Sequence, residues 1–152
     1  MRALILGLGN PILSDDAVGL LVARRLFERI GKEDVDLVEA AISGLQTVQL
    51  LSRYDRAVII DCLLDRTRIG KLRRIEVEEL KASPLLSSHG VGLGQAIRVA
   101  KQLGMRLPEP LLIYAIAIAD PYSFGERLTP ELERALPSLV QQIASDLTRI
   151  WT

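Results

Sequence analysis

Short apolar runs alternate with stretches of helical periodicity along most of the chain. Four runs predict buried strands, because each is short and rich in aliphatic residues: Arg2–Leu8, Val35–Ala40, Ala57–Ile60 and Leu111–Ala119. Three stretches predict helices, because their apolar residues recur every three or four positions: Ala17–Ile30, Gly44–Tyr54 and Val91–Leu103. Lys71–Val77 alternates apolar and charged residues, which is typical of an edge or hairpin strand.

A clear start signal precedes one more predicted helix, the last in the chain. Thr129 is a favoured N-cap residue, Pro130 suits the first helical position, and the carboxylate of Glu131 suits the positive end of the helix dipole. Aliphatic residues then recur along one face as far as Ile150. We expect a long amphipathic helix with Thr129 as its cap.

The alternation of strands and helices predicts an α/β protein, a three-layer α/β/α sandwich with a mainly parallel, twisted sheet. Neither a linker nor an internal repeat divides the sequence, so residues 1–152 are expected to form one domain. Ligands of such sheets bind at the carboxyl ends of the strands. The polar residues at those ends are therefore the candidates for function.

Charge and hydropathy exclude several classes of protein. The chain has 19 basic and 19 acidic residues and a formal net charge of zero, which argues against a nucleic acid or a membrane surface bound through bulk charge. No apolar run reaches the roughly 18 residues of a membrane span, and the N-terminal apolar run is too short for a signal peptide. Because Cys62 is the single cysteine, no disulfide forms within the chain, and we expect a cytoplasmic protein.

The chain has only one histidine, so any metal or acid–base chemistry must use carboxylates and His89. Asp16 begins the helix after the first strand, Asp61 directly follows Ala57–Ile60, and His89 lies in a Ser/Gly loop before a helix, whose dipole favours the neutral ring. Two carboxylates and one imidazole could bind a divalent transition metal and leave coordination positions open. For Asp15 and Asp16, helix capping is an equally good interpretation, and Asp61 could instead cap a loop.

Two other chemistries fit the residues less well. Gly7-Leu8-Gly9 after the first strand suggests a dinucleotide-binding turn, but the third glycine of that motif is absent. Asp15 and Asp16 would also repel a pyrophosphate at the start of the helix. Cys62 is a poor candidate for a nucleophile paired with His89, because neighbouring strand residues point to opposite faces of the sheet.

Four segments of the sequence resemble, in order, those of the hydrogenase maturation endopeptidases, which process the large subunit of nickel–iron hydrogenases. The most specific is Gly7-Leu8-Gly9-Asn10 … Leu13-Ser14-Asp15-Asp16 … Gly19, which resembles the N-terminal signature of the family. The other three are Ile59-Ile60-Asp61, Ser88-His89-Gly90-Val91-Gly92-Leu93, and Ala119-Asp120-Pro121 … Gly125 … Leu128-Thr129-Pro130-Glu131. The resemblance covers nearly the whole chain.

The resemblance implies a phosphorylase/hydrolase-like fold and a nickel-dependent endopeptidase. Its substrate would be the precursor of a nickel–iron hydrogenase large subunit, from which it removes a short C-terminal extension after nickel insertion. The nickel would be presented by the substrate and bound by Asp16, Asp61 and His89, and zinc or cadmium could take its place in a crystal. Water would be activated by one of these carboxylates, by Asp15, or on the metal.

Asp120, Tyr122 and Phe124, in the loop before the last helix, are candidates for contacting the precursor. No partner other than the precursor is expected, neither nucleic acid nor membrane, and we expect a monomer. Two positions depart from the family pattern: Ala17 follows the acidic pair where glycine is usual, and Glu39-Ala40-Ala41 stands where Asp-Gly-Gly is usual. A non-catalytic nickel-checking or assembly protein for the same precursor is therefore an alternative, and a nucleotide-binding α/β domain is a further one.

Overall fold

The structure is a computed structural model that describes residues 1–42, 44–81 and 92–151. In this part of the chain five strands form one sheet in the order β2-β1-β3-β5-β4. Their bounds are Ala3–Leu8 (β1), Val35–Ala40 (β2), Arg56–Leu64 (β3), Leu72–Ile75 (β4) and Leu111–Ile118 (β5). Strands β1, β2, β3 and β5 run parallel to one another, and β4 pairs antiparallel with β5 at the edge. The prediction of a mainly parallel sheet with Lys71–Val77 at its edge is confirmed.

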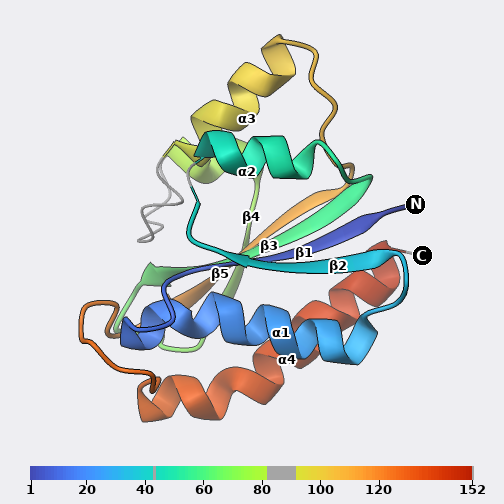
Figure 1. The fold of residues 1–152 in the computed structure, drawn as a ribbon. Coiled ribbons are helices and arrows are strands. Elements are labelled where there is room, and N and C mark those ends of the chain that lie inside the picture. Colours follow the sequence, from blue (N-terminus) through green and yellow to red (C-terminus); the bar gives the residue numbers. More distant parts are fainter. Residues whose placement is uncertain (43, 82–91, 152) are drawn as a thin grey trace.

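Helices cover both faces of this sheet, as Figure 1 shows. Helices α1 (Val18–Ile30) and α4 (Pro130–Ile150) pack on one face, and α2 (Gly44–Leu51) and α3 (Leu93–Gln102) pack on the other. Two short 3₁₀ helices, η1 (Ser14–Ala17) and η2 (Val77–Lys81), precede α1 and follow β4. None of the described helices is both long and apolar enough to cross a membrane. The predicted three-layer α/β/α architecture is confirmed.

The alternation of side chains along the central strands divides the core into two halves. On β3, Val58 and Cys62 pack with α1 and α4, whereas Ile59 and Leu63 pack with α2 and α3. All four side chains are buried. The run Ala57–Ile60 is continuously apolar because both faces of this strand are covered.

The predicted end of this central strand is wrong. The sequence pattern places Asp61 directly after the strand, but β3 continues to Leu64. Strand β1 pairs with β3 only as far as Gly7 opposite Ile60, whereas β5 goes on pairing from Asp61 to Leu64. The strand persists because one of its edges stays hydrogen-bonded to β5. Asp61 therefore lies inside a strand, at the point where β3 loses its β1 neighbour.

The helix boundaries differ from the prediction in detail. The first helix begins with the 3₁₀ turn of η1 and ends at Ile30, as predicted. Helix α2 ends at Leu51, before the predicted Tyr54, and α3 begins at Leu93, whereas the predicted start at Val91 lies outside the described residues. Pro130 opens α4 as predicted, but the Thr129 hydroxyl does not cap the helix.

Candidate functional site

The order of the strands reverses between β1 and β3. The chain passes from β1 outward to β2 and then returns to the other side of β1 as β3. The carboxyl ends of strands at such a reversal form the usual ligand crevice of an open α/β sheet. Asp16 follows β1, and Asp61 lies on β3 just past its last pairing with β1, so both belong to this end of the sheet.

Two glycines allow the chain to fold back tightly at this point. A side chain at Gly9, which has a φ of +155°, would place its Cβ 2.1 Å from the carbonyl oxygen of Asp16. A side chain at Gly19 would place its Cβ 2.6 Å from the carbonyl oxygens of Ile60 and Leu8. Glycine is required at both positions because no real Cβ tolerates such contacts. The glycines of the N-terminal signature therefore serve the packing of η1 and α1 against β1 and β3.

The Asp16 carboxylate is fixed by hydrogen bonds at both oxygens. Asp16 is only 7% exposed. The backbone N–H of Asn10 donates to Oδ2 at 2.8 Å, and the thiol of Cys62 donates to Oδ1, with Sγ 3.4 Å away. Among the described residues no basic side chain pairs with Asp16. The result is a buried carboxylate held in one orientation against β3.

Asp61 is buried on the same strand, one residue before Cys62. It is 1% exposed, and its Oδ1 accepts the backbone N–H of Cys62 at 2.8 Å. Burial raises the pKa of the Cys62 thiol well above its ordinary value, and the carboxylates of Asp61 and Asp16 raise it further. The thiol therefore stays protonated and donates its hydrogen bond to Asp16, a setting that disfavours a thiolate nucleophile.

Asp15 has a different environment from its neighbour. It is fully buried, and its carboxylate accepts hydrogen bonds from the backbone N–H groups of Ala119, Asp120 and Thr129 and from the Thr129 hydroxyl, at 2.7 to 3.1 Å. These four bonds tie η1 to the loop of residues 119–129, which precedes α4. The interpretation of Asp15 and Asp16 as helix caps is wrong, because neither side chain caps η1 or α1. The carboxylates serve other elements of the fold instead.

The loop of residues 119–129 presents aromatic side chains to solvent. Tyr122 is 64% exposed and Phe124 is 84% exposed. Asp120 shapes the loop, because its Oδ1 accepts the N–H groups of Tyr122 and Ser123. Hydrogen bonding from the Ser123 side chain, and then from these two N–H groups, lowers the pKa of Asp120. Asp120 therefore has a local structural role within the loop. The two aromatic side chains are exposed to solvent.

The sequence analysis missed one neighbour of these aromatics, Ile12. It is 50% exposed, and its carbonyl accepts, at 2.8 Å, the N–H of Gly125 in the loop of residues 119–129. A bridge between Leu13 and Gly125 joins the two loops as well. The sequence did contain a signal for Ile12, because it is an apolar residue in a segment without helical or strand periodicity. Ile12, Tyr122 and Phe124 are hereafter called the apolar rim.

The third predicted metal ligand, His89, lies outside the described residues. Within the described residues no group of three or more histidine, cysteine, aspartate or glutamate side chains could hold a metal ion. Asp16 and Asp61 supply two carboxylates, one bonded to the Cys62 thiol and the other to the Cys62 backbone N–H. Oxygen ligands of this kind suit a divalent cation only when further ligands complete the site. The metal site of Asp16, Asp61 and His89 stays a prediction.

Comparison with known proteins gives a consistent result. The family model for hydrogenase maturation protease matches residues 20–146. The chain is 28% identical over 143 residues to the hydrogenase expression/formation protein HupD of Bradyrhizobium diazoefficiens, covering 91% of this chain and 74% of that protein. It is 24% identical over 151 residues to the hydrogenase 2 maturation protease of Escherichia coli, covering 97% and 91%.

Solved structures share the fold. The hydrogenase maturating endopeptidase HybD from E. coli superposes with a TM-score of 0.81 at 22% identity, over 98% of this chain and 93% of that one. The [NiFe] hydrogenase maturation protease HybD from Thermococcus kodakarensis superposes with a TM-score of 0.68 at 26% identity, over 97% and 99%. These superpositions support the α/β fold described above.

Proposed function

The chain belongs to the hydrogenase maturation protease family, and we propose that it is the endopeptidase that removes a short C-terminal extension from the precursor of a nickel–iron hydrogenase large subunit. The family match, over residues 20–146, supports a hydrolase of peptide bonds. One structural observation carries the assignment of its site. Two buried carboxylates, Asp16 and Asp61, flank Cys62 where the strand order reverses.

We assign nickel recognition to these two carboxylates together with His89. Asp16 is a buried carboxylate that pairs with no cation among the described residues, which is costly, and a divalent cation brought by the substrate would relieve that cost. Asp16 makes two hydrogen bonds but no salt bridge within the described residues. Two carboxylates and one imidazole leave coordination positions for ligands from the precursor. Cleavage would then depend on nickel already being in place in the substrate.

The chain's own residues divide the remaining work. The hydrogen bonds from Asn10 and Cys62 keep Asp16 in one orientation before substrate arrives, which reduces reorganisation during the reaction. Asp15 is engaged by four donors, so we assign it to holding the loop of residues 119–129 in place. General-base activation of the attacking water is left to Asp16 or Asp61.

The apolar rim is the proposed contact surface for the precursor. Ile12, Tyr122 and Phe124 lie on two loops joined to each other by the Gly125 hydrogen bond and to η1 by Asp15. Large apolar side chains that stay exposed beside a crevice are typical of surfaces that bind another protein. Binding there would bring the end of the precursor next to Asp16.

The test is to incubate the purified protein with nickel-loaded large-subunit precursors and to follow the mass of their C-termini. Trimming of a precursor with nickel, and none without it, is the expected result. If the unmutated protein trims no cognate precursor, the peptidase assignment is wrong. A stable complex with uncut, nickel-loaded precursor would instead support the nickel-checking alternative.

A further inference from the structure

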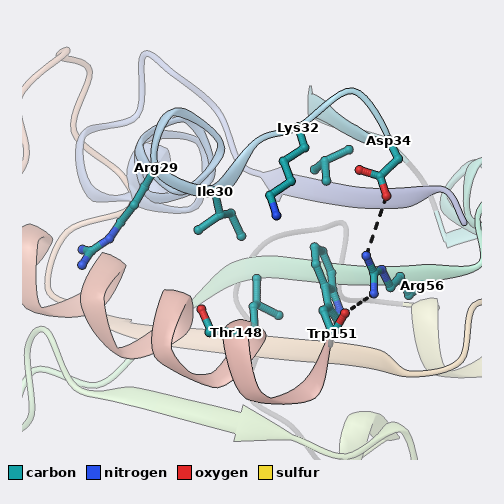
Figure 2. A pocket seen from close by; sticks show the side chains of 9 residues that line it. Arg29, Ile30, Lys32, Asp34, Arg56, Thr148 and Trp151 are labelled. Atoms are coloured by element: carbon teal, nitrogen blue, oxygen red, sulfur yellow. Dashed lines mark hydrogen bonds and ion pairs between the residues drawn. The ribbon is translucent and has the colours of Figure 1, made fainter.

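A second pocket lies at the opposite end of the sheet from Asp16 and Asp61. It has a volume of about 410 Å³ and lies between the last turns of α1 and α4 and the first residues of β2 and β3 (Figure 2). Val35 and Arg56 open those two strands, and Ile30 and Trp151 lie at the ends of the two helices. The volume falls in the range of small-molecule sites. This pocket is separate from the proposed catalytic crevice.

Positive charge dominates the polar lining of this pocket. Arg29, Lys32 and Arg56 contribute three cations, and Asp34 contributes one carboxylate. Asp34 lies 3.9 Å from Arg56, a long ion pair, and Arg29 donates to Gln141 on α4. Lys32 makes no ion pair within the described residues, and in Figure 2 its amino group points into the pocket. The lining therefore carries more positive charge than the described side chains neutralise.

Two N–H donors beside the pocket have no acceptor. Arg56 Nε and Trp151 Nε1 are buried and make no hydrogen bond within the described residues. The Arg56 guanidinium lies over the Trp151 ring at 5.0 Å and also donates to the Trp151 carbonyl. The cation and the aromatic ring thus form one wall of the pocket.

The rest of the lining is apolar. Ile30, Val35 and Leu147 line the pocket together with Trp151. An inorganic ion would leave this apolar surface uncovered, whereas an anion with a hydrophobic body would cover it. We propose that the pocket binds a small organic anion, a carboxylate or a phosphate ester. Its charged head would lie between Lys32 and Arg56, and its apolar body would lie along Trp151.

Trp151 offers a direct reporter, because it is the only tryptophan in the chain. Benzoate and phenyl phosphate are titrated into the protein while tryptophan fluorescence and the single indole N–H resonance are followed, with sodium chloride at matched ionic strength. A saturable change with at least one of the two organic anions, and a much weaker one with inorganic phosphate, is expected. No saturable change with either organic anion, or an equal response to inorganic phosphate, would overturn the proposal.

Variants locate the binding. Lys32→Ala is expected to weaken the binding about tenfold, the loss typical of one charge-assisted hydrogen bond. Arg56→Lys keeps the charge but removes the planar guanidinium that lies over Trp151, and it should weaken binding as well. Lys101→Ala, an exposed lysine on α3 across the sheet, is the matched control and should bind as the unmutated protein does. Equal weakening by Lys101→Ala and Lys32→Ala would mean that only bulk charge is sensed, and would also overturn the proposal. None of these measurements depends on peptidase activity.

Discussion

The Cys62 thiol donates a hydrogen bond to Oδ1 of Asp16, with Sγ 3.4 Å from the oxygen, although 46 positions separate the two residues. The bond connects β3 to the turn after β1 across the point where the strand order reverses. Cys62 also donates its backbone N–H to Oδ1 of Asp61, so one residue bonds to both carboxylates. The two carboxylates thus share one hydrogen-bonding partner, Cys62.

Removing the Cys62 thiol should make Asp16 more mobile without unfolding the protein. Cys62→Ala is expected to lower the rate of precursor trimming about three- to tenfold and to cost about 1 kcal/mol of stability, from one lost weak hydrogen bond and a small cavity. Cys62→Ser retains a donor and should keep most of the activity. Trimming rates under saturating precursor and urea unfolding measure the two effects. Equal activity of Cys62→Ala and the unmutated protein would show that the bond does not position Asp16 for the reaction.

The predicted nickel ligands should be needed for cleavage far more than for folding. Asp16→Asn, Asp61→Asn and His89→Ala are each expected to lower the trimming rate by about 100-fold or more, as loss of a group at the reacting centre typically does. Glu131→Gln, an exposed carboxylate at the start of α4, serves as the control. Mass spectrometry of the precursor gives the rates, and circular dichroism checks the fold. Trimming at the normal rate by His89→Ala would remove His89 from the mechanism.

Asp15 should matter first for stability. Asp15→Asn presents an amide to buried N–H donors, so we expect a loss of about 2–4 kcal/mol in the free energy of unfolding. Thr129→Val removes only the hydroxyl that donates to Asp15, at 3.1 Å, and should cost about 1 kcal/mol. Urea unfolding followed by fluorescence measures both. If Asp15→Asn is as stable as the unmutated protein, the four bonds do not hold the loop of residues 119–129.

The apolar rim should affect binding of the precursor and leave the chemical step alone. Phe124→Ser and Tyr122→Ser are expected to raise KM for the precursor about tenfold or more at nearly unchanged kcat and stability, because both side chains are exposed. Leu103→Ser removes an apolar side chain that is 73% exposed, just after α3, and is the control. An unchanged KM in both loop variants would place the docking surface elsewhere.

One carboxylate should make stability depend on pH in acid. The Tyr54 hydroxyl donates to Asp36 at 2.7 Å and, together with Arg2, lowers the pKa of that carboxyl below its ordinary 3.8. A lowered folded-state pKa means that the stabilisation is present above that ordinary value and is lost as the pH falls through the folded-state pKa. Tyr54→Phe should therefore cost less than about 1 kcal/mol at pH 7, since the Asp36 side chain is 42% exposed, and close to nothing near pH 2. Urea unfolding at the two pH values measures the difference, and a cost independent of pH would contradict the pairing.

Local pattern was enough for most of the fold. The strands β1, β2 and β5 and the helices α1 and α4 lie where the apolar periodicity predicted them, because burial on one or both faces fixes which positions must be apolar. The same pattern placed Asp16 and Asp61 at the carboxyl end of the sheet. The prediction that His89 completes this site rests on the sequence alone, because His89 and its neighbours lie outside the described residues.

What the pattern could not supply was the partner of each polar group. Asp15 and Asp16 are identical neighbours in the sequence, yet one binds a loop more than 100 residues away and the other meets Cys62. The Thr129 hydroxyl donates to Asp15 instead of capping α4, and β3 continues past Asp61 because β5 goes on pairing with it. Hydrogen bonds and strand ends depend on which distant segments meet in space, and an apolar periodicity records only that a position is buried.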